Sequence, residues 1–325
     1  MKIRLWGTRG SLPASFSQDK LREKLVGTLM AAQGQSFDSQ KAIEEFVDHK
    51  LDRTLSSTCG TNTCNIEIEY KENEFILCDA GTGIRDFSYE FYKTDPKRVG
   101  TFHLFMSHLH WDHIQGFPFF GPIYHKGNRV IIHSYHQKTQ QVFKNQMSSP
   151  CFPVDFKQLG AEVIFDIKTP GSPFELDGMK VIGIQQYHPG LSYGYKFENK
   201  EGKKVVYSTD CEHTEKAHEE GYPFVDFYKD ADVLIFDAMY SLTDASVNKA
   251  EWGHSSNIMG VKLAARAKAK HLIIFHHEAI RSDFELEDFF VHTKKYSDLY
   301  NKERNIPHGY PEKISLAYDG MIIVA

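Results

Sequence analysis

The stretch Ser107-His108-Leu109-His110-Trp111-Asp112-His113 decides how the rest of the chain is interpreted. It directly follows the apolar run at residues 102–106, which is typical of a buried strand. In an extended segment, residues two apart point to the same side, so His108 and His110 can offer two imidazoles to one cation. The aspartate and the histidine that end the stretch enter the next turn, where they can serve a second cation. Imidazole and carboxylate ligands suit zinc, manganese or iron.

Four other polar residues each stand at the carboxyl end of an apolar run, namely Asp79, His188, Asp210 and His276. Loops at such strand ends gather functional groups on an α/β scaffold. One such residue alone is more often a cap or a packed polar side chain, but the repetition weakens that explanation. His277 is an alternative to His276, because a shift of one residue exchanges them. We favour His276 because it immediately closes the run at residues 272–275.

Most of the predicted elements are strands. Short runs rich in β-branched and aromatic residues predict strands near residues 2–6, 65–70, 75–78, 102–106, 130–133, 162–166, 180–185, 194–198, 204–208, 233–236, 271–275, 314–318 and 321–324. Helical patterns occur at 19–30, 39–55, after His113, and at 255–269 and 284–301. Asp319-Gly320 predicts a hairpin turn between the last two strands. No linker is evident, so we predict one α/β domain over residues 1–325, with a helical insertion at about 14–58.

Composition excludes several classes of protein. The formal net charge is −5, from 38 basic and 43 acidic residues. Without a dense block of Lys or Arg, a long nucleic acid is disfavoured as a ligand, although a small anion is not. No apolar stretch approaches the length of a membrane span, and the N-terminus lacks the apolar run of a secretory signal, so we expect a cytoplasmic protein. Five cysteines without a C-x-x-C pair argue against a disulfide framework or a zinc ribbon.

The ordered set of polar residues resembles a known family. Asp79, His108-x-His110-x-Asp112-His113, His188, Asp210 and His276 look like the five motifs of the metallo-β-lactamase fold, over residues 1 to about 280. The segments at 7–11, 60–64 and 113–120 resemble the phosphodiesterase branch, which includes cyclic-nucleotide phosphodiesterases and tRNase Z. The resemblance implies an αβ/βα sandwich of two mixed sheets flanked by helices. The insertion at 14–58 departs from the family pattern.

The resemblance also implies a centre of two divalent metal ions, with zinc as the first choice and manganese or iron as alternatives. One metal would be bound by His108, His110 and His188. The other would be bound by Asp112, His113 and His276, with Asp210 as the bridge between the two. Asp79 would hydrogen-bond a ligand and fix its orientation.

A further pair bears on the reaction. The segments around Asp237 and His254 resemble the carboxylate and histidine elements with which the tRNase Z-like branch protonates a leaving oxygen. When a hydroxide that bridges two metals attacks phosphorus, the opposite oxygen must depart as an alkoxide. A positioned imidazole can protonate that leaving oxygen. We therefore predict His254 as the general acid and Asp237 as its orienting partner. The alternative is that both residues are structural.

The sequence evidence for other candidate substrate-binding residues is weaker. Arg9 could clamp a phosphate or form a salt bridge within its loop. By family analogy, Asn62 and Thr63 line the metal cleft. The aromatic residues of the metal loop, Trp111, Phe117, Phe119 and Phe120, either stack on a base or belong to the core, and the core is the commoner outcome.

These observations predict a binuclear metal-dependent phosphodiesterase that acts on a small phosphodiester, first of all a cyclic nucleotide. One alternative is tRNA 3′ processing by a tRNase Z relative. Hydrolysis of a thioester or lactone is another, but it gives His254 no task. A nucleotide sensor without catalysis is also possible, although such proteins usually lose a ligand and none is missing. A homodimer remains open, and the insertion could be a lid, a dimer contact or a specificity element.

Overall fold

The computed structural model describes residues 1–304 and 309–325. Within them, strands form two seven-stranded sheets and one two-stranded sheet. The first sheet has the order β16 (Ile322–Val324), β1 (Lys2–Gly7), β3 (Asn65–Lys71), β4 (Glu74–Cys78), β5 (Thr101–Phe105), β6 (Arg129–Ser134) and β7 (Glu162–Ile167). The second has the order β15 (Lys313–Leu316), β13 (His271–Phe275), β12 (Val233–Asp237), β11 (Lys204–Ser208), β10 (Ser192–Glu198), β9 (Met179–Gln186) and β8 (Phe174–Leu176). The small sheet pairs β2 (Arg9–Gly10) with β14 (His277–Glu278).

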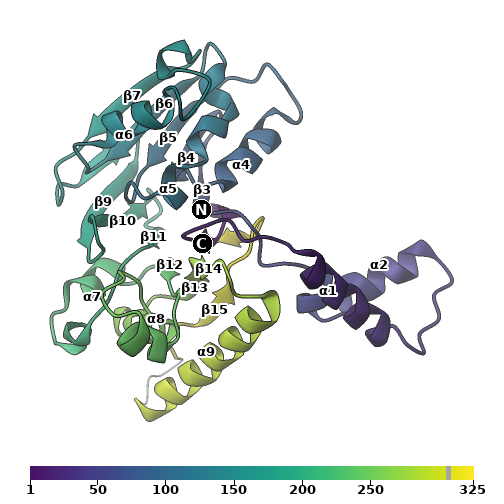
Figure 1. The fold of residues 1–325 in the computed structure, drawn as a ribbon. Coiled ribbons are helices and arrows are strands. Elements are labelled where there is room, and N and C mark those ends of the chain that lie inside the picture. The colour runs from purple at the N-terminus through teal and green to yellow at the C-terminus, as the bar shows by residue number, and fades with distance from the viewer. Residues whose placement is uncertain (305–308) are drawn as a thin grey trace.

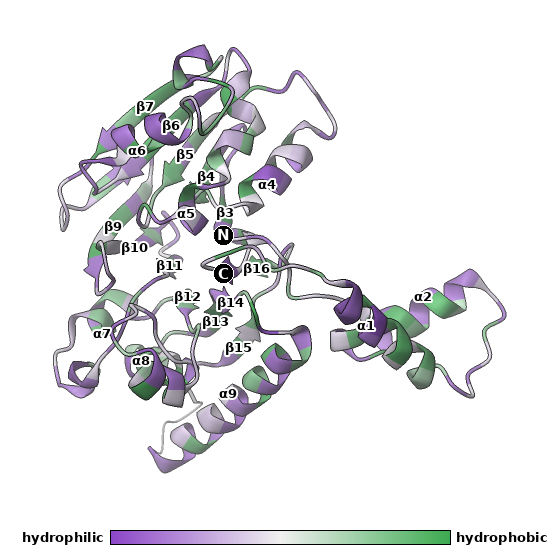
Figure 2. Cartoon of the chain, viewed as in Figure 1, coloured by the Kyte–Doolittle hydropathy of each residue, from purple (hydrophilic) through white to green (hydrophobic). Residues whose placement is uncertain are grey.

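Both large sheets are mixed. Strands β4 to β7 run parallel in the first sheet, as do β11, β12, β13 and β15 in the second, and the remaining pairs are antiparallel. Strands β12 and β13 bury all of their residues, as expected of parallel strands covered on both faces. Figure 2 shows hydrophobic residues concentrated on strands such as β5 and β7 and alternating with hydrophilic ones along α9 (Asp283–Glu303).

The inner faces of the two sheets pack against each other. Phe105 of β5 meets Tyr195 and Phe197 of β10, with ring centroids 5.4 and 5.1 Å apart. Outside the first sheet lie α4 (Gly83–Tyr92) and α6 (Thr139–Gln146); α7 (Pro223–Tyr228), α8 (Asn257–Ala267) and α9 cover the second (Figure 1). This arrangement confirms the predicted sandwich of two mixed sheets flanked by helices.

Short helical segments complete the chain. These are α5 (Trp111–Ile114), the 3₁₀ turns at Phe117–Phe119, Gly121–Tyr124, Phe156–Gln158 and Glu215–His218, and a π-helical turn at Asp244–Asn248. The helix predicted after His113 is therefore a single turn that already begins at Trp111. Among the described residues, no helix combines the length and the apolarity that crossing a bilayer requires.

The segment between β2 and β3 contains α1 (Gln18–Ala31), α2 (Gln40–His49) and α3 (Arg53–Ser56), and Figure 1 shows α1 and α2 to one side of the sheets. The helix predicted at 39–55 is wrong in its length, because it is two helices. Asp52 accepts a hydrogen bond from the Thr54 backbone nitrogen at 2.8 Å and so caps a new helix. Lys24 ties α1 to α9 through Asp283, at 2.9 Å. We propose residues 14–58 as an insertion into one domain.

The predicted hairpin at Asp319-Gly320 is wrong, because β15 and β16 lie in different sheets. The Asp319 carboxylate accepts hydrogen bonds from the backbone nitrogens of Thr61 and Asn62, both at 2.9 Å, and from the Thr8 hydroxyl at 3.0 Å. These contacts hold the chain as it crosses from the second sheet to the first. The Asp319-Gly320 pair is compatible with a turn that crosses between two sheets as well as with a hairpin turn.

A buried histidine at the start of β13 should make stability depend on pH. His271 lies 2.8 Å from the Ser315 hydroxyl, and burial together with nearby Lys313 lowers its pKa to about 4. The unfolded chain, with an ordinary histidine pKa near 6.5, binds this proton more readily than the native state, so stability falls as pH drops from about 6.5 towards 4. Between pH 7 and 5, the wild type should lose more unfolding free energy than His271→Gln, by at most about 1.4 kcal/mol per pH unit.

Urea unfolding followed by circular dichroism at pH 7, 6 and 5 measures this difference. Glutamine keeps a nitrogen near the position that contacts Ser315 but cannot titrate. Parallel pH profiles for the two proteins would contradict the assignment.

Candidate metal centre

The structure brings all seven predicted ligands together where strands of both sheets end. One group contains His108, His110 and His188, and a second contains Asp112, His113, Asp210 and His276. Within each group, the possible ligand atoms lie within 4.8 Å of one another. The residues come from four separate segments, after β5, β9, β11 and β13, so the cluster is a product of the fold rather than of local sequence.

An unusual backbone conformation recurs at the strand ends. Asp79 follows β4, Asp210 follows β11 and His276 follows β13, with φ angles of 58°, 52° and 62°. A positive φ is uncommon outside glycine and costs on the order of 1–3 kcal/mol. The sharp change of direction places each of these side chains in the site.

Asp210 lies between the two groups of ligands. Its Oδ1 is 3.2 Å from the Nε2 atoms of both His113 and His276. Its Oδ2 is 3.7 Å from the Nε2 atoms of His108 and His188. Each oxygen of one carboxylate thus faces one group, which is the geometry that a bridging ligand needs.

The donor set fits divalent cations. The Nε2 atoms of His108, His113 and His276 are buried and have no hydrogen-bond partner. Buried nitrogens are rarely left unpaired in proteins, and each such exception asks for an explanation. On His113 the opposite nitrogen, Nδ1, lies 2.7 Å from Asp79, which directs the lone pair of Nε2 into the site. Nitrogen and carboxylate ligands suit zinc, manganese or iron.

The pKa shifts of the histidines are consistent with metal binding by this donor set. Burial lowers the pKa values of His108, His110 and His188, so these imidazoles are neutral and able to bind a cation at neutral pH. Burial opposes a charge on His113 too, but the carboxylates of Asp112, Asp210 and Asp79 outweigh it and raise its pKa well above the usual value. A cation at Nε2 would replace that proton.

Asp79 is fully buried and binds four donors at 2.7 Å. These are the backbone nitrogen and the hydroxyl of Ser107, Nδ1 of His113 and the hydroxyl of Tyr207. Its contact with His113 is the one expected of a residue that orients a ligand. Tyr207 was missed by the sequence reasoning, because a tyrosine within an apolar strand is typical of core.

His254 and Asp237 lie beside both groups. Nδ1 of His254 is 2.9 Å from Oδ2 of Asp237, and its ring lies 5.0 and 5.2 Å from the rings of His276 and His188. Burial disfavours the charged imidazolium, but Asp237 outweighs burial and raises the pKa of His254 to about 9. The backbone nitrogens of Cys211 and Met239 hold the Asp237 carboxylate at 3.3 and 3.1 Å.

A family profile described as a beta-lactamase superfamily domain matches residues 74–277, more than half of the chain. The chain belongs to the beta-lactamase superfamily. Ribonuclease Z from Prochlorococcus marinus (strain NATL1A) is 23% identical over 282 residues, which cover 68% of this chain and 85% of that protein. The superfamily assignment confirms the predictions of the metallo-β-lactamase fold and of a metal-dependent hydrolase.

Solved structures share the same fold. The metallo-beta-lactamase fold protein YhfI from Bacillus subtilis has a TM-score of 0.60 and 14% identity, with 99% of this chain and 98% of that chain covered. The short form of human tRNase Z has a TM-score of 0.59 and 16% identity, with 100% and 99% covered. Yeast PDE1 has a TM-score of 0.56 and 14% identity, with 81% and 95% covered. At these identities the likeness establishes the fold alone.

Three glycines of this superfamily domain are required by close contacts. A Cβ on Gly116 would lie 2.0 Å from the Gly81 carbonyl oxygen, and one on Gly81 would lie 2.5 Å from the Asp112 carbonyl oxygen. A Cβ on Gly253 would lie 2.2 Å from Nδ1 of His188, and the Gly253 carbonyl accepts a hydrogen bond from that nitrogen at 2.8 Å. Gly253 therefore orients His188, a role that sequence reasoning did not find.

His276 and His277 differ sharply in their surroundings. His276 belongs to the ligand group, whereas Nε2 of His277 lies 2.9 Å from the Ala317 carbonyl oxygen. Burial lowers the pKa of His277 to about 3. The geometry thus favours His276 as the ligand.

The three predicted substrate-binding residues face protein instead. The Arg9 guanidinium donates to the carbonyl oxygens of Gly60 and Arg281, at 2.8 and 3.0 Å, and lies 3.6 Å from Asp283. Asn62 donates to Asp86 at 2.7 Å, and Thr63 is fully buried. The guanidinium of Arg9 is thus engaged within the protein, as in the salt-bridge alternative. Substrate binding by Arg9, Asn62 and Thr63 stays a prediction.

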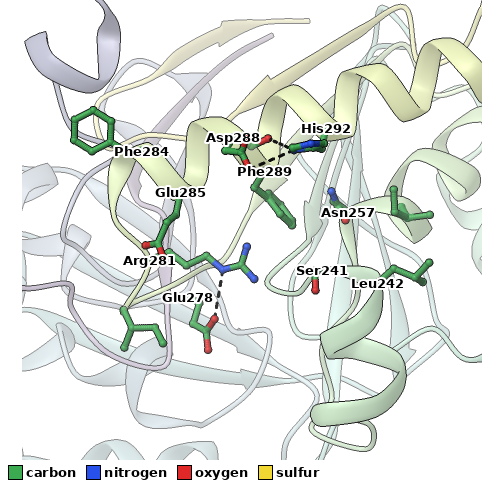
Figure 3. Close-up of a pocket in the computed structure, with 12 residues that line it drawn as sticks. Ser241, Leu242, Asn257, Glu278, Arg281, Phe284, Glu285, Asp288, Phe289 and His292 are labelled. Atoms are coloured by element: carbon green, nitrogen blue, oxygen red, sulfur yellow. Dashed lines mark hydrogen bonds and ion pairs between the residues drawn. The ribbon is translucent and has the colours of Figure 1, made fainter.

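A cavity of about 800 Å³ lies between the loop after β12 and the first half of α9 (Figure 3). Arg281 points into it but is paired with Glu278 at 3.4 Å and packs on Phe289. Glu285 and Asp288 add further negative charge to its wall. The excess of negative charge in its lining disfavours binding of a phosphate in this cavity.

Matched substitutions separate the two neighbouring histidines. We expect His276→Gln to lower the metal content by about one equivalent per chain, because it removes a buried nitrogen from the ligand group. His277→Gln should leave the content unchanged, since glutamine can keep the contact with Ala317. Elemental analysis of the purified proteins measures both, and loss of metal from His277→Gln alone would reverse the assignment.

Chelation should destabilise the protein. Without a cation, the carboxylates of Asp112 and Asp210 and the unpaired imidazole nitrogens remain buried together. A ligand that binds only the native state adds about 4 kcal/mol at a thousand times its Kd, so the melting temperature should fall by several degrees in EDTA. Differential scanning calorimetry before chelation, after it and after return of zinc or manganese tests this. An unchanged melting temperature after confirmed metal loss would contradict it.

Proposed function

We propose that the chain is a phosphodiesterase that uses two divalent metal ions to hydrolyse a small phosphodiester, with a 3′,5′-cyclic nucleotide as the leading substrate. The observation that carries this proposal is the pair of His254 and Asp237, which lies next to both ligand groups. Zinc is the proposed metal and the cytoplasm the proposed location, on the sequence arguments given above.

Two metal ions, when bound, lower the pKa of water and neutralise charge on phosphoryl oxygens. The residues of the chain supply the other half of the reaction. Asp237 holds Nδ1 of His254, so the proton available for transfer is on Nε2. With a pKa of about 9, His254 carries that proton at neutral pH and can give it to the departing oxygen. The two backbone nitrogens that hold Asp237 fix the direction of the transfer.

The names of several relatives support chemistry at phosphorus. A ribonuclease Z is among the curated relatives, and a diphosphatase from the PhnP family shares the fold at a TM-score of 0.55. Hydrolysis of a thioester or lactone would give His254 no role as a general acid. A sensor without catalysis is disfavoured because all seven residues predicted to bind metal are present and lie in the two ligand groups.

Processing of tRNA 3′ ends is a second candidate, favoured by the similarity to ribonuclease Z. The net charge of −5 counts against it, because tRNA binding depends on many phosphate contacts. Steeply salt-dependent binding of tRNA would favour this candidate over a small substrate.

The task of His254 predicts a dependence on the leaving group. His254→Ala should lower kcat for 3′,5′-cyclic AMP by roughly 10²- to 10⁴-fold, because its alkoxide must be protonated to depart. The loss on bis-p-nitrophenyl phosphate should be much smaller, since p-nitrophenolate departs without a proton. His292→Ala, an exposed histidine on α9, is the control.

Steady-state kinetics with matched metal content in all three proteins gives the comparison. Equal losses on both substrates would remove His254 as the general acid, and so would unchanged turnover.

A further inference from the structure

Solvent reaches the metal centre past one ligand. His110 is exposed and His188 is partly buried, whereas the other five candidate ligands are buried. Nε2 of His188 lies 3.1 Å from Nδ1 of His110, and Nδ1 of His188 contacts the Gly253 carbonyl. His110, His188 and the backbone at Gly253 therefore lie together at the more exposed end of the ligand groups.

Three exposed aromatic residues are neighbours of these positions in the chain. Trp111 follows His110 and is 81% exposed. Tyr187 precedes His188, and Trp252 precedes Gly253; they are 54% and 60% exposed. Because His188 contacts both His110 and Gly253, the three aromatic residues stand on loops that meet at His188. We call Trp111, Tyr187 and Trp252 the aromatic rim. Large apolar side chains grouped in solvent beside a site indicate a surface that binds something.

A cavity of about 560 Å³ is lined by one residue of the rim, Tyr187, and by Gly253, the neighbour of Trp252. Tyr187, Pro189 and Leu191 give it an apolar wall, and it reaches His188 and Gly253. Its volume lies within the range typical of small-ligand sites, roughly 300–1,000 Å³. The ring of Phe224, whose centroid is 5.9 Å from that of Tyr187, supports this wall from behind.

The charges of this cavity limit its occupant. Glu212 and Glu251 oppose a single cation, Lys216, so a second phosphate is disfavoured. Gln185 and Thr214 offer hydrogen-bonding groups along the same wall. An uncharged aromatic heterocycle with polar edges meets all of these conditions, and a nucleobase is such a group.

We propose that the aromatic rim and this cavity bind the base of a single nucleotide whose phosphodiester lies at the metal centre. The proposal rests on the proposed function and narrows its substrate to phosphodiesters that carry a base. The rings provide stacking surfaces, and stacking tolerates different bases. Specificity among bases then depends on the polar groups of the cavity wall.

Binding of adenosine 5′-monophosphate and ribose 5-phosphate to the metal-loaded protein tests this proposal without turnover. Both carry the same phosphate, and only the first has a base. By isothermal titration calorimetry, we expect the wild type to bind the nucleotide at least tenfold more tightly. The nucleotide should also quench tryptophan fluorescence, because two of the three tryptophans, Trp111 and Trp252, belong to the rim and Trp6 is buried.

Substitutions assign the effect to the rim. Trp111→Ala should weaken nucleotide binding by roughly tenfold and leave ribose 5-phosphate binding unchanged, while Trp111→Phe should restore most of the affinity. Tyr89→Ala, which removes a 70% exposed ring from α4, is the matched control and should bind like the wild type.

Equal affinity for the two ligands, or an unchanged Trp111→Ala, would overturn the proposal. Turnover of bis-p-nitrophenyl phosphate by the wild type keeps this failure separate from that of the proposed function. If that substrate is hydrolysed while the base adds no affinity, only the rim assignment is wrong.

Discussion

One buried carboxylate connects the two sheets at the site. Asp79, at the end of β4 in the first sheet, binds the hydroxyl of Tyr207 on β11 in the second. The same carboxylate binds Ser107 in the metal loop and Nδ1 of His113. A fully buried charge is tolerated only when it is well hydrogen-bonded, and removing one donor leaves it costly. The packing of the sheets, the path of the loop and the orientation of an imidazole therefore depend on one another.

Backbone strain accompanies this carboxylate. Asp79, Asp210 and His276 all have positive φ angles, and all three side chains enter the site. Such conformations persist where the surrounding structure determines them, and here each follows a strand inside a seven-stranded sheet. The close contact between Gly81 and Gly116 adds a steric limit, because neither position has room for a side chain. The strands and these contacts thus position the ligand groups relative to one another.

The strands and the ligand set could be predicted because they depend on residues close together in the sequence. Features that depend on contacts between distant residues could not be predicted. The buried runs of β12 and β13 and the His108 to His113 spacing depend on neighbouring residues alone. In contrast, Asp319 binds a loop more than 250 positions away in the chain, so its turn could not be distinguished from a hairpin. Arg9 faces Asp283 for a similar reason. Helix α4 was missed because it starts at Gly83 without a side-chain cap.

Arg9 is paired within the protein, so under the proposed function a phosphate would be bound by other groups. Lys249 and Arg281 are each paired with Glu278. An overall charge of −5 does not favour long-range attraction of polyanions. Under the proposed function, the bound cations and His254 would counter the charge of the phosphate, and further affinity would come from uncharged contacts. Under the proposed function, this balance would favour a small ester with a large aromatic substituent over a long chain of phosphates.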